Sequence, residues 1–280
     1  MTDTKLQTLG EIFNQKFFRI PDYQRGYSWD EEQLEEFWDD LENLKPEKIH
    51  YTGLLTVELI DRKIIEQNDL WRDDLWMLEK GFKAYYVIDG QQRLTTIIIL
   101  LKVILDQFED SEGINLDQKI NWVSKFMYQK YGEYKSFIFG YEKDNPSDEY
   151  FKTKILNQDS IASLLVPEQT LYTMNLKRAK DYFEDKVDFL TKNELNSLFK
   201  KVVNSLKFNF YEIDNDLDVY VTFETMNNRG KPLSKLELLK NRLIYLSTLL
   251  PNDEGDKLRL RREINDAWKT IYEYDLPPIC

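Results

Sequence analysis

The sequence is poor in cysteine and histidine, and each shortage excludes a kind of chemistry. Among 280 residues there is a single cysteine, Cys280, so the chain can form neither an internal disulfide nor a cysteine-based zinc site. His50 is the only histidine, whereas the active site of a metal-dependent HNH nuclease needs at least two. His50 could serve a Ser-His-Asp triad, but no Gly-x-Ser-x-Gly element accompanies it. We therefore expect an ordinary exposed or strand-edge histidine.

Long hydrophobic runs and an excess of positive charge are also missing. The longest aliphatic run, 97–101, ends at Lys102 and is too short to cross a bilayer, and the N-terminus lacks the basic and apolar regions of a signal peptide. We expect a soluble, cytoplasmic protein without membrane contact. The 38 Lys and Arg residues face 50 Asp and Glu, which gives a net charge of −12. Such a chain can hold a polyanion only at a local basic pocket.

The composition is that of a folded protein with a large core. Hydrophobic residues make up 42% of the chain and charged residues 31%, which excludes disorder and allows one large domain or two small ones. The patterns predict an α+β fold that is mostly helical, built on a small mixed sheet. We divide it into a core (1–110), a helical insertion or subdomain (111–206), and a returning strand with C-terminal helices that complete the core (207–280).

Hydrophobic spacing predicts the individual elements. Two Ser-x-x-Glu capping boxes, at Ser28 and Ser234, are expected to open helices. The stretch 61–83 is interpreted as an excursion over the surface, and 116–204 as helical. The predicted strands are 53–60, 84–88 and 208–213, and the predicted helices are 30–44, 94–108, 216–226, 235–246 and 256–272.

The segment 89–96, Asp-Gly-Gln-Gln-Arg-Leu-Thr-Thr, is the best candidate site. Gly90 allows a tight exit from a strand, and the backbone N–H groups that follow lie in a first helical turn that favours an anion such as phosphate. Arg93 adds a fork of donors, Gln91 and Gln92 can hold an oxygen or orient a water, and Asp89 can bind a cation or accept a proton. The structural alternative is that Asp89 caps the helix and Arg93 pairs with an acidic surface.

A second candidate lies in the aromatic segment 20–29, Ile-Pro-Asp-Tyr-Gln-Arg-Gly-Tyr-Ser-Trp. Its aromatic residues alternate with Gln24 and Arg25, which would suit the stacking of a base beside a guanidinium. The alternative is an N-terminal arm that Tyr23, Tyr27 and Trp29 pin to the core. That alternative explains Arg25 less well, because a charge among aromatic rings needs a partner.

A third candidate is the glycine-containing loop within 223–234. Asn227 or Asn228, together with Gly230, can adopt left-handed geometry, so the loop can aim Arg229 and Lys231 at one place, although it also suits an ordinary linker between two helices. If the three motifs form one site, Arg25, Arg93 and Arg229 should converge in one cleft. Three guanidinium groups would gather in an acidic protein only to hold a polyanion.

Together and in this order, the three motifs, with Leu239-Lys240-Asn241 downstream, resemble the N-terminal domain of GmrSD-type, modification-dependent restriction proteins. The resemblance spans roughly residues 8 to 273. That family is related to the nucleotide-binding core of ParB and sulfiredoxin, so the resemblance implies a ParB-like sheet. It also implies a phage-defence domain that binds and hydrolyses a nucleoside triphosphate and couples that state to a nuclease.

The resemblance also implies roles for residues and partners. Asp89, Gln91, Gln92 and Arg93 would form the hydrolysis motif, with Mg²⁺ at Asp89. Modified DNA would be a partner. Because the family's HNH-type active site is not in this sequence, either the chain is a truncated or naturally short version or the nuclease is a separate partner, and a homodimer stays open. The alternatives are a non-catalytic nucleotide- or DNA-binding switch and a helical protein-docking scaffold. Base or DNA sensing would involve Tyr23, Gln24 and Arg25, and the nucleotide would be held by Arg25, Gly90, Arg93, Thr95, Asn227, Arg229, Gly230, Lys240 and Asn241.

Overall fold

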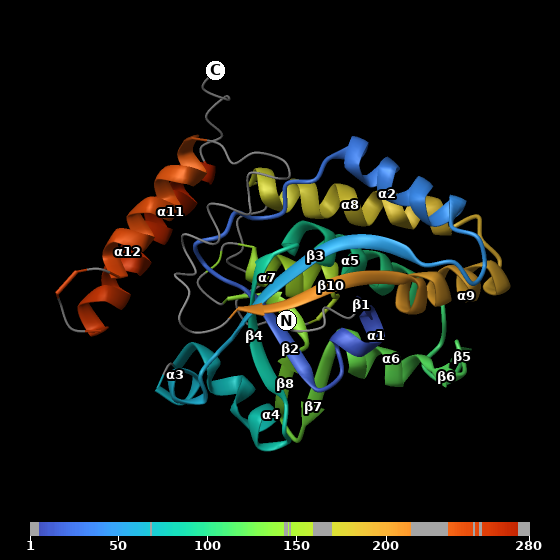
Figure 1. The fold of residues 1–280 in the computed structure, drawn as a ribbon, viewed down its shortest axis with the longest axis horizontal. Coiled ribbons are helices and arrows are strands. Elements are labelled where there is room, and N and C mark those ends of the chain that lie inside the picture. The colour runs from blue at the N-terminus through green and yellow to red at the C-terminus, as the bar shows by residue number, and fades with distance from the viewer. Residues whose placement is uncertain are drawn as a thin grey trace.

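A six-stranded mixed sheet forms the centre of the computed structural model, which describes residues 6–67, 69–142, 145, 147–158, 170–213, 235–248, 250–251 and 254–273 (Figure 1). The strand order is β1-β10-β3-β4-β2-β9. Two small hairpins, β5-β6 and β7-β8, lie outside this sheet. The strands are β1 (Leu6–Thr8), β2 (Lys16–Ile20), β3 (His50–Leu59), β4 (Lys83–Asp89), β5 (Gly113–Ile114), β6 (Asp117–Gln118), β7 (Tyr128–Tyr131), β8 (Tyr134–Phe137), β9 (Phe139–Tyr141) and β10 (Leu206–Ile213).

Helices cover the sheet and extend beyond it. Helix α8 contacts both α5 and α2, and α11 and α12 form a pair at one side of the body (Figure 1). The helices are α1 (Leu9–Ile12), α2 (Glu31–Asn43), α3 (Arg62–Gln67), the 3-10 helix η1 (Asp69–Asp74), α4 (Leu75–Glu79), α5 (Gln91–Asp106), α6 (Lys119–Phe126), α7 (Asp148–Tyr150) with the π-helical turn η2 (Phe151–Ile155), α8 (Leu171–Val187), α9 (Lys192–Lys200) with the π-helical turn η4 (Lys201–Ser205), α11 (Lys235–Thr248) and α12 (Glu254–Glu273).

The topology confirms the α+β class. Strand β10 pairs in parallel with β3 from Leu206 opposite His50 to Ile213 opposite Glu58, so the strand from far along the chain completes the sheet as expected. The pairs β2-β4 and β2-β9 are also parallel, whereas β3-β4 and β1-β10 are antiparallel. The carboxyl ends of β2, β4 and β9 therefore lie at one edge of the sheet, next to the β4–α5 turn.

Helix α5 is the central helix of the core. It buries 13 of its 16 residues, which agrees with the prediction of a helix that is apolar on nearly every side. The predicted helix 30–44 is confirmed as α2, but its cap is different. The N-cap is Asp30, whose backbone N–H donates to Gln33 Oε1 (3.1 Å), and the Ser28 N–H donates elsewhere. The predicted capping box at Ser28 is therefore wrong, because a long-range partner outcompetes the local one.

Two interpretations of longer segments need correction. The stretch 61–83 is not a surface excursion, because α3, η1 and α4 bury Ile65, Trp71, Trp76 and Met77 in the main core. Nor is 116–204 wholly helical, since it contains a β7-β8 hairpin and strand β9. Gly132, with φ +59, forms the hairpin turn, and residues alternating on either side of such a glycine are typical of a hairpin.

Several predictions fall on residues that the structure does not describe. These are the helix 216–226, the capping residue Ser234, and Asn227, Arg229 and Gly230 of the third motif. The domain boundaries stay a prediction, although the range 111–206 adds β9 to the sheet and shares the main hydrophobic core. Within the described ranges, no helix is both long and apolar enough to cross a membrane.

Candidate functional site

The candidate site begins at the turn between β4 and α5. Asp89 ends the strand, Gly90 is the N-cap of the helix with φ +93, and Gln91 is the first helical residue. A Cβ on residue 90 would lie 3.0 Å from the Leu54 carbonyl oxygen, so both the backbone angle and the space favour glycine. Gly90 has no side chain that could cap the helix, and the alternative in which Asp89 caps it stays a prediction.

Arg93 lies in the first turn of α5 and is held against β3. Its Nη1 donates to the Thr52 carbonyl and its Nη2 to the Leu54 carbonyl, both at 2.8 Å. These two carbonyls point to the same side of β3, and they lie beyond Thr56, where the pairing of β3 with β4 ends opposite Asp89. Strand β4 therefore offers them no backbone N–H, and the Arg93 guanidinium supplies the donors instead. The Asp89 carboxylate lies 3.8 Å from Nη2. Arg93 thus has a structural task, while 28% of its side chain stays exposed.

Gly53 makes room for this guanidinium. Its φ is +116, and a Cβ built there would lie 1.8 Å from Arg93 Nη1. A side chain at position 53 would therefore force Arg93 out of place. Gly53 is the first residue of the predicted strand 53–60 but lies inside β3, where an isolated glycine indicates a bulge or a close backbone approach.

The aromatic segment 20–29 lies along the same turn, which brings the first two motifs together. The Gln24 side-chain amide donates to the Val87 and Ile88 carbonyls of β4, at 2.5 and 3.0 Å. From the other side, Gln92 accepts from the Ser28 N–H (2.8 Å) and donates to the Gly26 carbonyl (3.1 Å). Arg25 lies between these two attachments and is 7% exposed.

The aromatic residues of this arm are packed inside the protein. Tyr23 and Tyr27 are 4% and 0% exposed, and the Tyr27 hydroxyl is hydrogen-bonded to Thr96 Oγ1 (2.7 Å). Tyr23 belongs to a small apolar cluster with Ile88 and Ile244. These contacts favour the alternative in which the aromatic residues pin the arm, while Gln24 and Ser28 are bonded to groups beside the β4–α5 turn.

Two buried amide oxygens at this turn have no hydrogen-bond partner among the described residues. They belong to Gln24, which is 1% exposed, and Gln91, which is 5% exposed. A buried acceptor without a donor costs free energy, so each of these oxygens favours an incoming N–H, hydroxyl or water.

The other predicted phosphate ligands have contacts of a different kind. The Thr95 hydroxyl is hydrogen-bonded to Tyr141. Lys240 Nζ donates to the Asp22 carbonyl (2.7 Å), and Asn241 beside it is 4% exposed. Helix α11, which carries Lys240, thus contacts the arm. Convergence of Arg25, Arg93 and Arg229 stays a prediction, because Arg229 is outside the described residues.

A buried polar cluster around Asp22 was not predicted. The Asp22 N–H donates to Glu142 Oε2, its Oδ1 accepts from Arg261 Nη2 and its Oδ2 from Asn265 Nδ2, all at 2.8 Å. Glu142 Oε1 also accepts from the Tyr86 hydroxyl. The only local signal was an aspartate in a segment rich in buried aromatic residues, since a buried carboxylate needs donors.

Burial changes the pKa values in this cluster. Desolvation raises the pKa of the Glu142 carboxyl to about 7, and the charge of Asp22 adds to the rise while Arg261 opposes it. Desolvation lowers the pKa of the Lys240 ammonium to about 8, against the opposing effects of Asp22 and Glu237. Both shifts disfavour the charged form.

The first prediction concerns Glu142→Gln. Because the folded-state pKa lies above the ordinary value of 4.5, the folded protein binds the extra proton between pH 4.5 and about 7, and stability falls as pH rises through that window. A neutral glutamine can keep contacts to Tyr86 and Asp22 without this loss. The melting temperature of Glu142→Gln minus that of wild type should therefore be larger at about pH 8 than at about pH 5.

Thermal unfolding followed by circular dichroism measures this difference. Glu66→Gln is the matched control, since Glu66 pairs with Arg62 on the surface and 46% of its side chain is exposed. The difference in melting temperature between Glu66→Gln and wild type should hardly change with pH. An equal offset for Glu142→Gln at both pH values would contradict the prediction.

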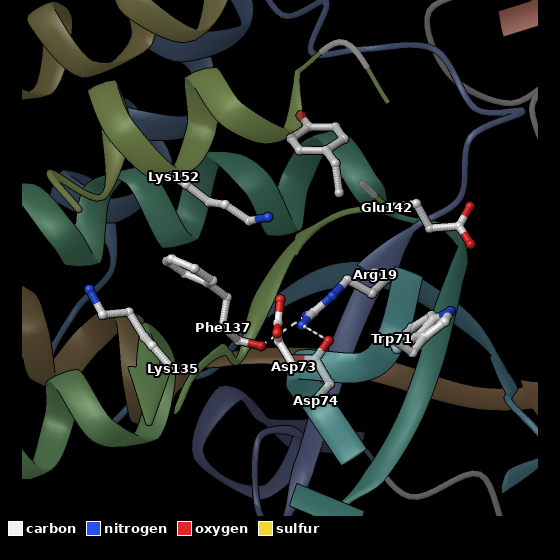
Figure 2. Close-up of a pocket in the computed structure, with 9 residues that line it drawn as sticks. Arg19, Trp71, Asp73, Asp74, Lys135, Phe137, Glu142 and Lys152 are labelled. Carbon is white, nitrogen blue, oxygen red and sulfur yellow. Dashed lines mark hydrogen bonds and ion pairs between the residues drawn. The ribbon is translucent and has the colours of Figure 1, made fainter. Parts of the chain in front are cut away.

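A separate pocket lies next to this cluster and shares Glu142 with it (Figure 2). Arg19, Lys135 and Lys152 face Asp73, Asp74 and Glu142, and Trp71, Phe137 and Tyr141 provide apolar walls. The Arg19 guanidinium is bonded to Asp74 at 2.7 Å, the Lys152 ammonium to Asp148, and the Lys135 ammonium to Gln158 at 2.8 Å. None of the predicted site residues lines this pocket.

The described residues contain no group of three or more His, Cys, Asp or Glu side chains that could hold a metal ion. His50, the first residue of β3, has its Nε2 3.6 Å from Asp40 Oδ2, which confirms an ordinary histidine near the surface.

These features define an α+β protein in which a glycine turn opens a buried helix beside an arm that carries Gln24 and Arg25. Comparison with known protein families gives a match to "GmrSD restriction endonuclease, N-terminal domain" over residues 9–244. The chain belongs to this family and is thus a component of a restriction system, as the motifs predicted. A search of curated proteins finds no match.

Proposed function

We propose that this chain is a nucleotide-binding, nucleotide-hydrolysing sensor domain of a modification-dependent restriction system. The observation that carries the proposal is the joining of two motifs, since Gln92 fastens the Gln24–Arg25 arm beside the Gly90 turn. Arg25 and Arg93 thereby lie on adjoining segments at the N-terminal end of a 16-residue helix. Two arginines near a helix N-terminus are suited to a triphosphate, which an acidic chain could not otherwise attract.

The contacts divide the roles among the residues. Arg93 and Arg25 would hold phosphate oxygens, and the backbone N–H groups after Gly90 would add donors. Asp89, with 24% of its side chain exposed, would hold Mg²⁺. Because Mg²⁺ usually binds one or two carboxylates plus phosphate and water, one aspartate at the turn fits that ion. The buried Gln24 and Gln91 oxygens would accept from the nucleoside or from an ordered water.

Hydrolysis in this proposal depends on Asp89 and Gln91. Gln92 has both ends of its amide engaged with the arm, so we assign it to holding the arm. In-line attack on the γ-phosphate needs a positioned water and neutralisation of phosphate charge, which the metal at Asp89, Gln91 and Arg93 would provide. Modified DNA and a separate nuclease are the partners to which the nucleotide state would be reported.

The engaged amide of Gln92 also favours a second candidate, a nucleotide switch without turnover. In that case the site would bind a nucleotide as the first candidate does but would lack a group to orient the attacking water. The two candidates agree on binding and differ only in phosphate release.

The second prediction is that a nucleoside triphosphate raises the melting temperature. ATP, GTP, CTP and UTP are each added with and without Mg²⁺, and thermal shift is measured. A ligand at about one hundred times its Kd stabilises the folded state by about 2.7 kcal/mol, which is several degrees for a chain of this size. The release of inorganic phosphate from the same samples separates an enzyme from a switch. No shift with any of the four nucleotides would contradict both.

A further inference from the structure

Asp22 connects the arm to the C-terminal helix pair through its carbonyl and both of its carboxylate oxygens. Its N–H is bonded to Glu142, its carbonyl to Lys240 on α11, and its two carboxylate oxygens to Arg261 and Asn265 on α12. Lys240, Arg261 and Asn265 lie 218, 239 and 243 residues after Asp22 in the sequence. With 6% of its surface exposed, Asp22 is a buried link between distant segments.

The link is close to the ligand-binding part of the arm. Pro21 restricts the backbone just before Asp22. Two residues after Asp22, the Gln24 side chain is fixed to β4, and Arg25 follows directly. A displacement of Asp22 therefore strains the short segment that ends at Gln24 and carries Arg25 as its next residue.

The way the helices dock is suited to reversible movement. Besides the contacts of Asp22, the helix pair meets the core through the Tyr172 hydroxyl on α8, which donates to Glu237 Oε1 on α11 (2.8 Å), and through a small apolar cluster that includes Tyr23 and Ile244, separate from the main core. Buried ion pairs contribute little net stability, because water solvates the separated charges well. Undocking of α11 and α12 thus costs far less than unfolding the core.

We propose that Asp22 couples the α11–α12 pair to the ligand site. Docking of the helices holds the arm in its binding geometry, and a nucleotide bound at the arm tightens the docking. This inference rests on the proposed function. By linkage, the two effects must be equal in free energy, so the helix pair reports whether the site is occupied.

The third prediction concerns Asp22→Asn, which keeps the shape but turns one acceptor into a donor facing Arg261 or Asn265. If the docked population falls to about one tenth, the apparent Kd for nucleotide rises about tenfold. ATP, GTP, CTP and UTP are titrated calorimetrically into wild type and variant. Amide hydrogen exchange of α11 and α12 is measured with and without each nucleotide. We expect faster exchange in these helices of the variant, unchanged exchange in α5, and a response of the helices to nucleotide in wild type only.

Three further variants sharpen the test. Asp188→Asn removes an exposed aspartate at the end of α8 and should behave as wild type. The double variant Asp22→Asn with Asn265→Asp swaps the two side chains, so that a carboxylate again faces an amide. It should recover part of the nucleotide affinity, whereas two changes that merely destabilise the protein would lower the affinity further. Asn265→Ala keeps the charge of Asp22 and should give a smaller effect in the same direction, even if Asp22→Asn does not fold.

The outcomes separate the coupling from the proposed function. If wild type binds none of the four nucleotides, the proposed function fails and the coupling fails with it. If wild type binds nucleotide but exchange in α11 and α12 does not respond, the coupling alone is wrong. The coupling is also wrong if the exchange of the helices rises in Asp22→Asn while the affinity stays that of wild type.

Discussion

Replacing Arg19 with alanine is expected to destabilise the fold by about 3–5 kcal/mol, the usual effect of removing one partner of a buried ion pair. The side chains of Arg19 and Asp74 are 8% and 10% exposed, and their ion pair measures 2.7 Å. Arg19 Nη1 also donates to the carbonyls of Phe18 and Phe137, both at 2.9 Å, which joins β2 to the last residue of β8. Figure 2 shows Arg19 with Asp74 and Phe137. Alanine would leave a buried carboxylate and two carbonyls without these donors.

Urea unfolding of wild type and Arg19→Ala measures this loss. The matched control is Arg62→Ala. The side chains of Arg62 and Glu66 are 59% and 46% exposed, so their ion pair should contribute less than about 1 kcal/mol to stability. The double variant Arg19→Met with Asp74→Asn removes both charges and should recover much of the stability, because the unpaired carboxylate is the main cost. A loss below about 1 kcal/mol for Arg19→Ala would mean that water reaches Asp74 and replaces the guanidinium.

The parts of the fold that the sequence could predict are those with a local cause. Helix α5 follows from its apolar residues, and α2 from a stripe at helical spacing, so both were predicted close to their real bounds. Gly90 indicated a tight exit from β4, and its φ of +93 confirms that reading. The strands β1 and β2 gave no usable signal, because segments of three and five residues with a short helix between them are too brief for a periodic pattern.

The long-range contacts explain what could not be predicted. Gln92 looked like a group that could orient a water, but its partners are Gly26 and Ser28, more than sixty positions away. The same contact drew Ser28 away from the predicted capping box. Lys240 was expected at phosphate, yet its ammonium is bonded to the Asp22 carbonyl. In each case the residue type was informative about polarity, and only the fold decides which group satisfies it.

Arg93 is the residue on which the candidate site depends most, and it combines two tasks. Its guanidinium satisfies two β3 carbonyls, which holds the group in one place, and over a quarter of the side chain is still exposed at the turn. Each Nη carries a second N–H beyond the one given to β3, and Nε has one more. A group fixed in this way can bind phosphate with little loss of conformational entropy.

The last prediction is that Arg93→Ala abolishes the nucleotide-dependent rise in melting temperature while the protein stays folded. Loss of two hydrogen bonds to partly exposed carbonyls should cost about 1–3 kcal/mol in the absence of nucleotide. Loss of a bidentate phosphate ligand should weaken binding much more than loss of an ordinary contact, because no other group offers the same fork. Thermal shift with each of the four triphosphates, beside circular dichroism at low temperature, measures both effects.

Gly53→Ala provides a test that leaves the arginine itself in place. Its Cβ would lie 1.8 Å from Nη1, so the guanidinium must move, and the nucleotide-dependent shift should fall although no charge is lost. Arg259→Ala, at an arginine whose side chain is 73% exposed on α12, controls for a general change of charge and should keep the full shift. If Arg93→Ala also keeps the full nucleotide-dependent shift, Arg93 serves only as a hydrogen-bond donor to the Thr52 and Leu54 carbonyls of β3. The phosphate would then have to bind elsewhere, with Arg25 as the next residue to replace.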